Sequence, residues 1–205
     1  MKDIALIGYS GHAYVALEAF TSQGRNVAAY AEAEKKAKDP YDLIWLGSEN
    51  NESTLGLLKV YEYFVGIGDN QIRRKITEKL SKIIGVPLNA IHRSSIVSHS
   101  LKIGQGNLLA AGCVVNPQVR IDNGVICNTG SIIEHDCVLE DFVHVAPGAV
   151  LCGNIHVGEC SFIGANAVIK EGVRIGKNVI IGAGTVVIAD VADGKKLVGN
   201  PQRIL

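Results

Sequence analysis

Between Ile91 and Val187 every sixth residue is aliphatic, with Cys127 as the one small apolar substitute. Three residues after these positions the chain mostly carries Gly or Asn, which tolerate the positive φ of a tight corner. One short strand plus one corner is the hexapeptide repeat of a parallel β-helix. Three units close one triangular coil, so the repeated side chains stack inside a prism. The repeated positions are Ile91, Val97, Ile103, Leu109, Val115, Ile121, Cys127, Ile133, Leu139, Val145, Leu151, Val157, Ile163, Ile169, Ile175, Ile181 and Val187.

The first 85 or so residues have a different pattern, in which strand-like and helix-like segments alternate. This alternation predicts a small parallel α/β unit of Rossmann-like type. We therefore expect two domains, an α/β domain over residues 1–85 and an all-β parallel β-helix over residues 86–205. The predicted strands are Ile4–Gly8, Val27–Tyr30 and Tyr63–Ile67, and the predicted helices are Ala13–Gln23, Ser53–Tyr61 and Asn70–Leu80.

The last predicted helix has Asn70 in the position of an N-cap. Its apolar residues Ile72, Ile76 and Leu80 recur at helical spacing.

Composition excludes several classes of function. Twenty Lys and Arg balance twenty Asp and Glu, so the basic footprint of a nucleic-acid binder is absent. The N-terminal apolar run ends at Ile7, too short for a signal peptide or a membrane span. The five cysteines form no CxxC pair, so we expect reduced, buried thiols in a cytoplasmic protein.

Several passages carry a resemblance to a known family. Residues 128–138 read NTGSIIEHDCV, residues 142–145 read FVHV, and Val198-Gly199-Asn200-Pro201 lies near the end. Residues 8–13 read GYSGHA and residues 63–73 read YFVGIGDNQIR. Together they resemble the sugar O-/N-acyltransferase family of bacterial glycan biosynthesis, most closely the UDP-4-amino-sugar N-acetyltransferases of the bacillosamine pathway. The resemblance spans nearly the whole chain and is weakest from Glu32 to Glu62.

The resemblance implies a left-handed β-helix, a homotrimer, and transfer of an acetyl group from acetyl-CoA to the 4-amino group of a UDP-linked amino-dideoxy sugar. Such a transfer needs a base for the attacking amine, and histidine titrates in the right range. His135 is the candidate general base for direct attack on the thioester. The family places an acidic residue directly after this histidine to orient it, a role that falls to Asp136, with Glu134 as the alternative.

The same resemblance supplies the coenzyme contacts. It places His144 against acetyl-CoA and a backbone N–H near Gly153 at the oxyanion of the tetrahedral intermediate. It also places Ala165 and Ala183 along the coenzyme, in a groove between neighbouring prisms. The residue types of both alanines are ordinary for small corner positions.

The loop from Gly8 to Ala13 ends a predicted strand and opens a predicted helix, so it offers backbone N–H groups to a phosphate. It is an incomplete dinucleotide fingerprint, because Ser10 stands where the second glycine belongs. The family uses this loop, through Ser10, Gly11 and His12, for the nucleotide. The family also has contacts at Gly68 and Glu32, and at Asn128 near the sugar. Relatives carry an acidic pair where this chain has Ala31 and Glu32.

Three alternatives remain open on the sequence. His135 would serve O-acetylation of sialic acid or another sugar hydroxyl equally well. A zinc enzyme of the carbonic anhydrase type needs a close pair of histidine ligands, which His135, His144 and His156 do not provide, so we expect no metal. A non-catalytic scaffold would not need the His-Asp pair or the nucleotide-type loop.

Overall fold

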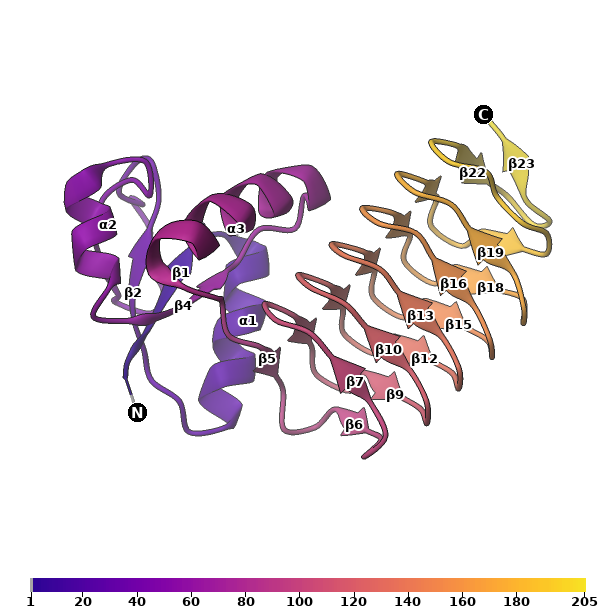
Figure 1. Cartoon of the computed structure of the whole chain (residues 1–205), viewed down its shortest axis with the longest axis horizontal. Helices are drawn as coiled ribbons and strands as arrows, with labels where there is room; N and C mark the ends of the chain where they lie inside the picture. The colour runs from indigo at the N-terminus through magenta and orange to yellow at the C-terminus, as the bar shows by residue number, and fades with distance from the viewer. Residues whose placement is uncertain (1) are drawn as a thin grey trace.

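The structure is a computed structural model and describes residues 2–205. It consists of an N-terminal α/β domain and a long three-sided prism, which Figure 1 shows side by side, the α/β domain in indigo and magenta and the prism running to yellow at the C-terminus. Met1, the first residue of the predicted 1–85 domain, lies outside the described residues. The predicted fold class is confirmed.

The α/β domain contains one parallel sheet in the order β3-β2-β1-β4. The short strand β3 was not predicted, since only two of its residues pair, and only with β2. The strands are β1 (Ile4–Ile7), β2 (Val27–Ala31), β3 (Ile44–Trp45) and β4 (Glu62–Val65), and the helices are α1 (Gly11–Ser22), α2 (Glu52–Leu58) and α3 (Asn70–Ile84).

The prism follows the six-residue period. From Ala90 to Val187 each strand pairs in parallel with the strand 18 positions away, for example Ile133 with Leu151. The second residue of each of these strands points inward, and from Leu109 to Val187 all of these side chains are buried in one continuous cluster. The first residue of each strand points outward. The period therefore determines both the core and the three outer faces.

Three sheets form the faces, and each is named here after one of its strands. The β11 sheet contains β5 (Ala90–Ile91), β8 (Leu108–Leu109), β11 (Ile126–Cys127), β14 (His144–Val145), β17 (Phe162–Ile163), β20 (Ile180–Ile181), β22 (Lys196–Val198) and β23 (Arg203–Ile204). The β12 sheet contains β6 (Ile96–Val97), β9 (Val114–Val115), β12 (Ile132–Ile133), β15 (Val150–Leu151), β18 (Val168–Ile169) and β21 (Val186–Val187). The β13 sheet contains β7 (Lys102–Ile103), β10 (Arg120–Ile121), β13 (Val138–Leu139), β16 (His156–Val157) and β19 (Arg174–Ile175).

The α/β domain is docked on the first coils of the β11 sheet. Phe20 of α1 and Leu6 of β1 share one buried cluster with Leu108 and Ile126 of the prism. Burial of this joint apolar surface stabilises the domain arrangement.

Helix α3 packs on the prism through polar residues, while its apolar Ile76 and Leu80 pack on the α/β sheet. Asn70, Arg73 and Thr77 are buried, whereas Ile72 is 51% exposed. The N-cap is one residue earlier than predicted, because the Asp69 side chain accepts a hydrogen bond from the Ile72 N–H at 2.9 Å. Polar side chains are favoured at this contact because the backbone carbonyls at the prism corners require hydrogen-bond donors.

Arg73 satisfies two of those carbonyls, and Asn70 satisfies two more. The Arg73 side chain is 1% exposed, and the guanidinium donates five hydrogen bonds of 2.8–3.0 Å. None of the acceptors is a carboxylate, so this buried cation is stabilised by carbonyl dipoles rather than by an ion pair. The acceptors are the carbonyls of Gly124 and Phe142 in the prism, the carbonyls of Ile67 and Gly68 after β4, and Oδ1 of Asn70.

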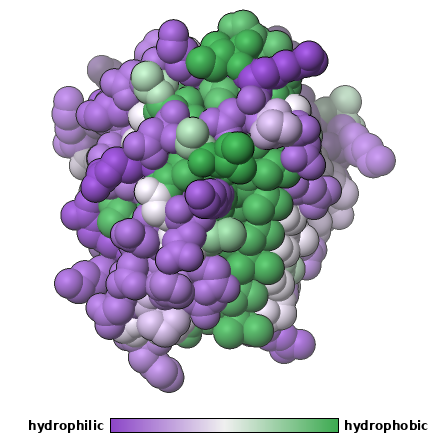
Figure 2. All heavy atoms as spheres, turned by 90° about the vertical axis from the view of Figure 1, so that its right-hand side faces the viewer, coloured by the Kyte–Doolittle hydropathy of each residue, from purple (hydrophilic) through white to green (hydrophobic). Residues whose placement is uncertain are grey.

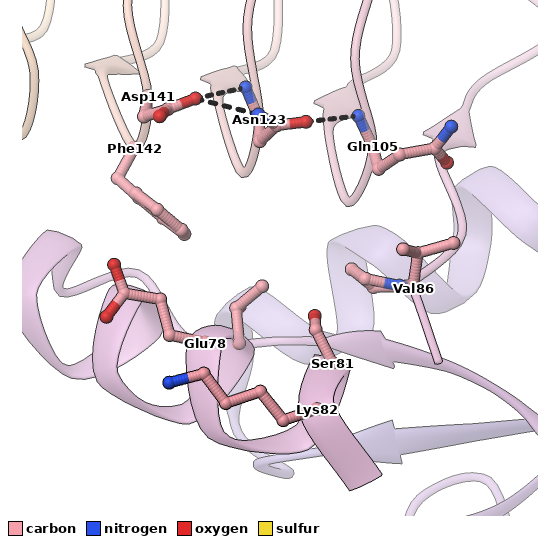
Figure 3. Close-up of a pocket in the computed structure, with 10 residues that line it drawn as sticks. Glu78, Ser81, Lys82, Val86, Gln105, Asn123, Asp141 and Phe142 are labelled. Carbon is pink, nitrogen blue, oxygen red and sulfur yellow. Dashed lines mark hydrogen bonds between the residues drawn. The ribbon is translucent and has the colours of Figure 1, made fainter. Parts of the chain in front are cut away.

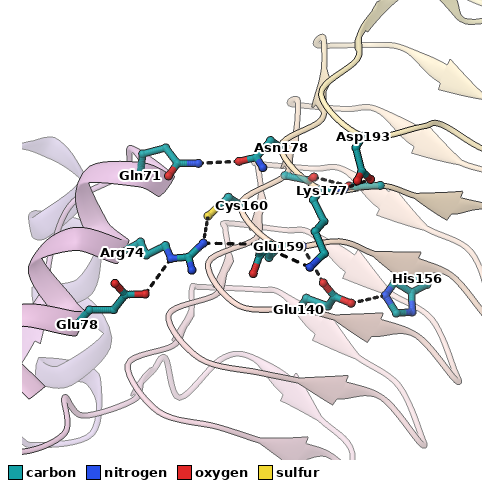
Figure 4. A network of polar contacts seen from close by, with 12 residues as sticks. Gln71, Arg74, Glu78, Glu140, His156, Glu159, Cys160, Lys177, Asn178 and Asp193 are labelled. Atoms are coloured by element: carbon teal, nitrogen blue, oxygen red, sulfur yellow. Dashed lines mark hydrogen bonds and ion pairs between the residues drawn. The ribbon is translucent and has the colours of Figure 1, made fainter.

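A second set of contacts between α3 and the prism is more exposed (Figure 4). Arg74 pairs with Glu78 at 2.8 Å on its own helix and with Glu159 of the prism at 3.6 Å. Gln71 donates to Asn178 at 2.7 Å. Exposed ion pairs add little stability each, so we assign the docking mainly to Arg73 and the shared apolar cluster.

The alternation of inward and outward positions predicts that substitutions at neighbouring residues differ sharply in their effect on the free energy of unfolding. Leu139→Ala should lower the free energy of unfolding by about 2–5 kcal/mol, because a fully buried side chain leaves a cavity. Val138→Ala, one residue earlier on the outer face, should lower it by about 1 kcal/mol or less. Urea denaturation measures both, and equal losses would contradict the assignment of faces.

Candidate functional site

His135 and Asp136 occupy a corner between the β12 and β13 sheets. The Nδ1 of His135 lies 2.9 Å from Oδ2 of Asp136. An ionised carboxylate only accepts hydrogen bonds, so Nδ1 carries the proton and Nε2 presents its lone pair. The His135 side chain is 54% exposed. The hydrogen bond to Asp136 raises the pKa of His135 above its usual value.

Gly153 lies one coil further along the same corner line. A Cβ at this position would lie 2.5 Å from Cε1 of His135, so only glycine leaves room for the imidazole. Among residues 2–205 no group accepts a hydrogen bond from the Gly153 N–H. The corner therefore holds a base packed against a glycine whose backbone N–H is unused.

His144 is in a different place, on β14 beneath the α/β domain, and is 7% exposed. Its Nδ1 lies 3.3 Å from the carbonyl oxygen of Gly68, and its Nε2 lies 3.3 Å from Nδ2 of Asn128. Its ring packs edge-on against Phe162, with centroids 5.0 Å apart. Burial, and then the positive charge of Arg73, lower the pKa of His144 to about 3.

The turn from β1 into α1 requires its first glycine. Gly8 has φ +83°, and a Cβ there would lie 2.6 Å from the Ile67 side chain. Ser10 is the N-cap of α1 but makes no side-chain capping bond, so the N–H groups of the first turn, beginning at Gly11, remain available to an anion.

His12, in this first turn, has a buried Nε2 atom without a partner among the described residues. Its ring centroid is 5.8 Å from that of His144. Burial lowers the pKa of His12 to about 4, and the charge of Arg73 contributes.

Glu32 follows β2 at the carboxyl edge of the sheet, next to this turn. Its carboxylate accepts a hydrogen bond from the Tyr9 N–H at 3.1 Å and pairs with Lys36 at 3.4 Å. The indole N–H of Trp45 donates to the Glu32 carbonyl at 3.1 Å. Ligands of parallel α/β sheets bind at this edge.

Ala165 and Ala183 follow β17 and β20, on the corner line between the β11 and β12 sheets. They stack in successive coils, where the Gly184 N–H donates to the Ala165 carbonyl at 2.8 Å. Asn128 follows β11 on the same side of the prism. This line and the His135 corner flank the β12 sheet on its two edges.

The predicted site residues thus form two groups in one chain. His135, Asp136 and Gly153 lie at one edge of the β12 sheet. Asn128, Ala165 and Ala183 lie at the other edge, with His144, Gly68 and His12 adjoining under the α/β domain. No hydrogen bond or ring contact among residues 2–205 joins the groups.

The structure resembles those of known sugar acetyltransferases over its whole length. The acetyltransferase domain of PglB from Neisseria gonorrhoeae, solved with acetyl coenzyme A, is 33% identical with a TM-score of 0.91, covering 100% of this chain and 99% of that one. The chain belongs to the sugar acyltransferase family. The PglD N-terminal domain matches residues 3–80 and the bacterial transferase hexapeptide (six repeats) matches residues 154–189. The family resemblance predicted from sequence is confirmed.

Two further solved structures are similar to this sugar acyltransferase. A variant of perosamine N-acetyltransferase from Caulobacter crescentus, with one histidine replaced by asparagine and with CoA and GDP-perosamine bound, is 33% identical with a TM-score of 0.93, covering 100% of this chain and 97% of that one. WeeI from Acinetobacter baumannii is 27% identical with a TM-score of 0.85, and each chain is covered completely.

Some features of this sugar acyltransferase lie outside the two groups. A cavity of about 450 Å³ between α3 and the prism is lined by Lys82, Asn123, Asp141 and Phe142 among others (Figure 3), and none of the predicted site residues reaches it. Residues 2–205 contain no cluster of three metal-ligating His, Cys, Asp or Glu side chains. No helix in this range has the length and hydropathy of a membrane span.

Arg73 is the site residue that the sequence reasoning missed. It lies in a helix rich in charged residues, where an arginine ordinarily faces solvent. The neighbouring Asn70 is buried together with Arg73 on this face, and that burial is visible only in the structure.

Asp136→Asn should lower the pKa of His135, because a neutral amide no longer stabilises the imidazolium. Asparagine tolerates the φ of +59° at this position, so the backbone should not change. An NMR titration of the His135 ring measures the pKa, with His156, which pairs with Glu140 on the β13 sheet, as an internal control. An unchanged titration of His135 would contradict the assigned contact.

Proposed function

We propose that this protein is an acetyl-CoA-dependent N-acetyltransferase acting on the 4-amino group of a UDP-linked amino-dideoxy sugar. The observation that carries the proposal is the His135–Asp136 pair packed against Gly153, whose N–H is unbonded. A base and an oxyanion donor on the same corner line are two elements that acyl transfer requires. Structures of relatives with acetyl coenzyme A or CoA and GDP-perosamine support the substrate class.

The chemistry follows from the state of the imidazole. The sugar amine attacks the thioester carbonyl, and Nε2 of His135 takes the proton that the nitrogen loses. Asp136, bonded to Nδ1, stabilises the resulting imidazolium. The N–H of Gly153 stabilises the oxyanion of the tetrahedral intermediate. When the carbon–sulfur bond breaks, the imidazolium returns the proton to the coenzyme A thiolate, so His135 ends neutral.

We propose a homotrimer in which each active site lies between two chains. The outward positions of the β12 sheet are all aliphatic, whereas those of the β13 sheet are mostly basic. Figure 2 shows apolar residues gathered in a column along one side of the molecule. Covering this face with a second chain would bring the His135 corner of one prism beside the Ala165 line of the next. The outward residues of the β12 sheet are Ile96, Val114, Ile132, Val150, Val168 and Val186.

In this arrangement acetyl-CoA lies in the groove along Ala165 and Ala183 and contacts His144. The nucleotide lies at the carboxyl edge of the α/β sheet. Ser10 and the free N–H groups of Gly11 and His12 face its phosphates, and Glu32 and Gly68 border it. Asn128 lies between the two substrates, near the sugar.

We further propose a cytoplasmic location. All five cysteines are free thiols. Burial raises the pKa of Cys137 to about 11, so it remains an unreactive thiol at neutral pH. Free thiols of this kind persist in a reducing compartment.

Purified protein with acetyl-CoA should release CoA when given a UDP-linked 4-amino sugar. His135→Gln should lower kcat by about 100-fold or more, because the base is lost. Thiol release measured with a chromogenic disulfide reports the rate. His156→Gln, a histidine of the outer β13 face, is the matched control and should keep the wild-type rate.

Parallel assays with GDP-linked 4-amino sugars and free sialic acid identify the acceptor. Turnover only with the GDP sugar would show that the donor nucleotide is GDP and not UDP. Turnover only with sialic acid would show that the acceptor is a hydroxyl group and not an amine. Full activity of His135→Gln would contradict the proposed mechanism.

Val150→Lys should dissociate the trimer, because it places a charge in the middle of the apolar β12 face. Light scattering should then report the 21.8 kDa monomer, with circular dichroism unchanged and acetyl transfer lost. Val138→Lys, at the equivalent outward position of the β13 sheet, should leave the mass of the assembly unchanged. Equal masses for both variants would contradict the proposed interface.

A further inference from the structure

We propose that His144 is a positioning residue, fixed as the Nδ1–H tautomer, which accepts a hydrogen bond from Asn128 and thereby aims the second amide hydrogen of Asn128 at an oxygen of the acceptor sugar. The inference rests on the proposed function and assigns roles within that site. It separates His144 from the acid–base chemistry carried by His135.

The tautomer follows from the partner of each ring nitrogen. Nδ1 faces the carbonyl oxygen of Gly68 at 3.3 Å. A carbonyl only accepts, so Nδ1 must carry the proton. In a neutral imidazole Nε2 then carries the lone pair and accepts from Nδ2 of Asn128 at 3.3 Å.

The orientation of the Asn128 amide is fixed from its other end. Its Oδ1 accepts a hydrogen bond from the Thr129 N–H at 2.8 Å. The amide therefore cannot flip without losing the contacts at both ends. One hydrogen of Nδ2 is directed at His144, and among residues 2–205 no group accepts the other. Asn128 is half-buried on the corner line that leads to Ala165, so this hydrogen is available to a ligand.

Arg73 holds the tautomer in place. The Gly68 carbonyl that receives the Nδ1–H of His144 also receives Nη1 of Arg73 at 2.9 Å, so both lone pairs of this oxygen are used. The charged or titratable groups that face the His144 ring are Arg73 and His12, and neither is acidic. A proton on Nε2 would face a positive charge and the amide donor of Asn128 together. The contacts thus form one chain from α3 of the α/β domain to the acceptor site.

The tautomer is directly measurable. In protein with ¹⁵N-labelled histidine, long-range ¹H–¹⁵N correlation should show a protonated Nδ1 and a bare Nε2 for His144. This pattern should persist from about pH 8 to about pH 5, while His135 takes up a proton. A protonated Nε2, or an imidazolium forming in this range, would overturn the proposal whatever the enzyme's substrate.

Two substitutions separate positioning from chemistry. His144→Gln places an acceptor where Nε2 was, and His144→Asn places a donor where Nδ1 was. The Asn variant should raise the KM for the amino-sugar nucleotide by about 10-fold or more, because Asn128 loses its partner. The Gln variant should recover most of the affinity for the amino-sugar nucleotide that the Asn variant loses. The acidic limb of the pH–rate profile should stay unchanged in both.

Other results would overturn the inference. If both variants lose kcat equally with an altered pH profile, His144 takes part in proton transfer. If neither changes the KM for the sugar nucleotide, His144 does not orient Asn128. His156→Gln serves as the control for histidine loss. Absence of turnover by the unsubstituted protein with any amino-sugar nucleotide would contradict the proposed function instead, and the NMR result would still decide the tautomer.

Discussion

The inward ladder of aliphatic side chains is the constraint on which the rest of the structure depends. Because every sixth residue is buried in one cluster, each coil is held in register with the next. The corners then stack in three straight lines, and a residue's place in the six-residue unit determines the line it joins. His135 with Gly153 and Ala165 with Ala183 are consequences of this rule. A slip of one residue would turn the ladder outward and disperse both groups.

A rigid column alone would not join a nucleotide site to an acyl site. That connection depends on Arg73, which hydrogen-bonds the loop after β4 and two prism corners at once. A buried cation without an acid partner is unusual and is tolerated here because carbonyl dipoles satisfy all its donors. Burial beneath the docked α/β domain lowers the pKa of His12 and His144, and the charge of Arg73 adds to this effect. Domain docking and the neutral state of both histidines are therefore linked.

The features that repeat along the chain could be predicted from the sequence. The inward positions could be read from the six-residue period, because burial there depends on residue type alone. The turn at Gly8 was also readable, since glycine between a strand and a helix has a known conformational use. Family resemblance, rather than any pattern in the residues, supplied the roles of Ala165 and Ala183.

Features that depend on packing between distant segments could not be read in this way. The polar face of α3 looked like solvent-exposed surface, and its true partners are carbonyls in the prism about 50 or more residues away. Strand β3 has only two paired residues, too few for periodicity. The burial of His144 arises where α/β domain and prism meet, so its sequence context, Val143 and Val145, indicates only a strand.

The central claim is that one chain presents the two halves of a site at opposite edges of its β12 sheet, so that a complete site needs two chains. Subunit mixing tests it most directly. Chains with His135→Ala and chains with Asn128→Ala, each nearly inactive alone, are assembled together with different tags and purified as mixed trimers. The account predicts about one third of the wild-type activity for purified mixed trimers, because only one of the three interfaces in such a ring pairs an intact His135 with an intact Asn128. Mixed trimers with no activity would show that each site lies within a single chain.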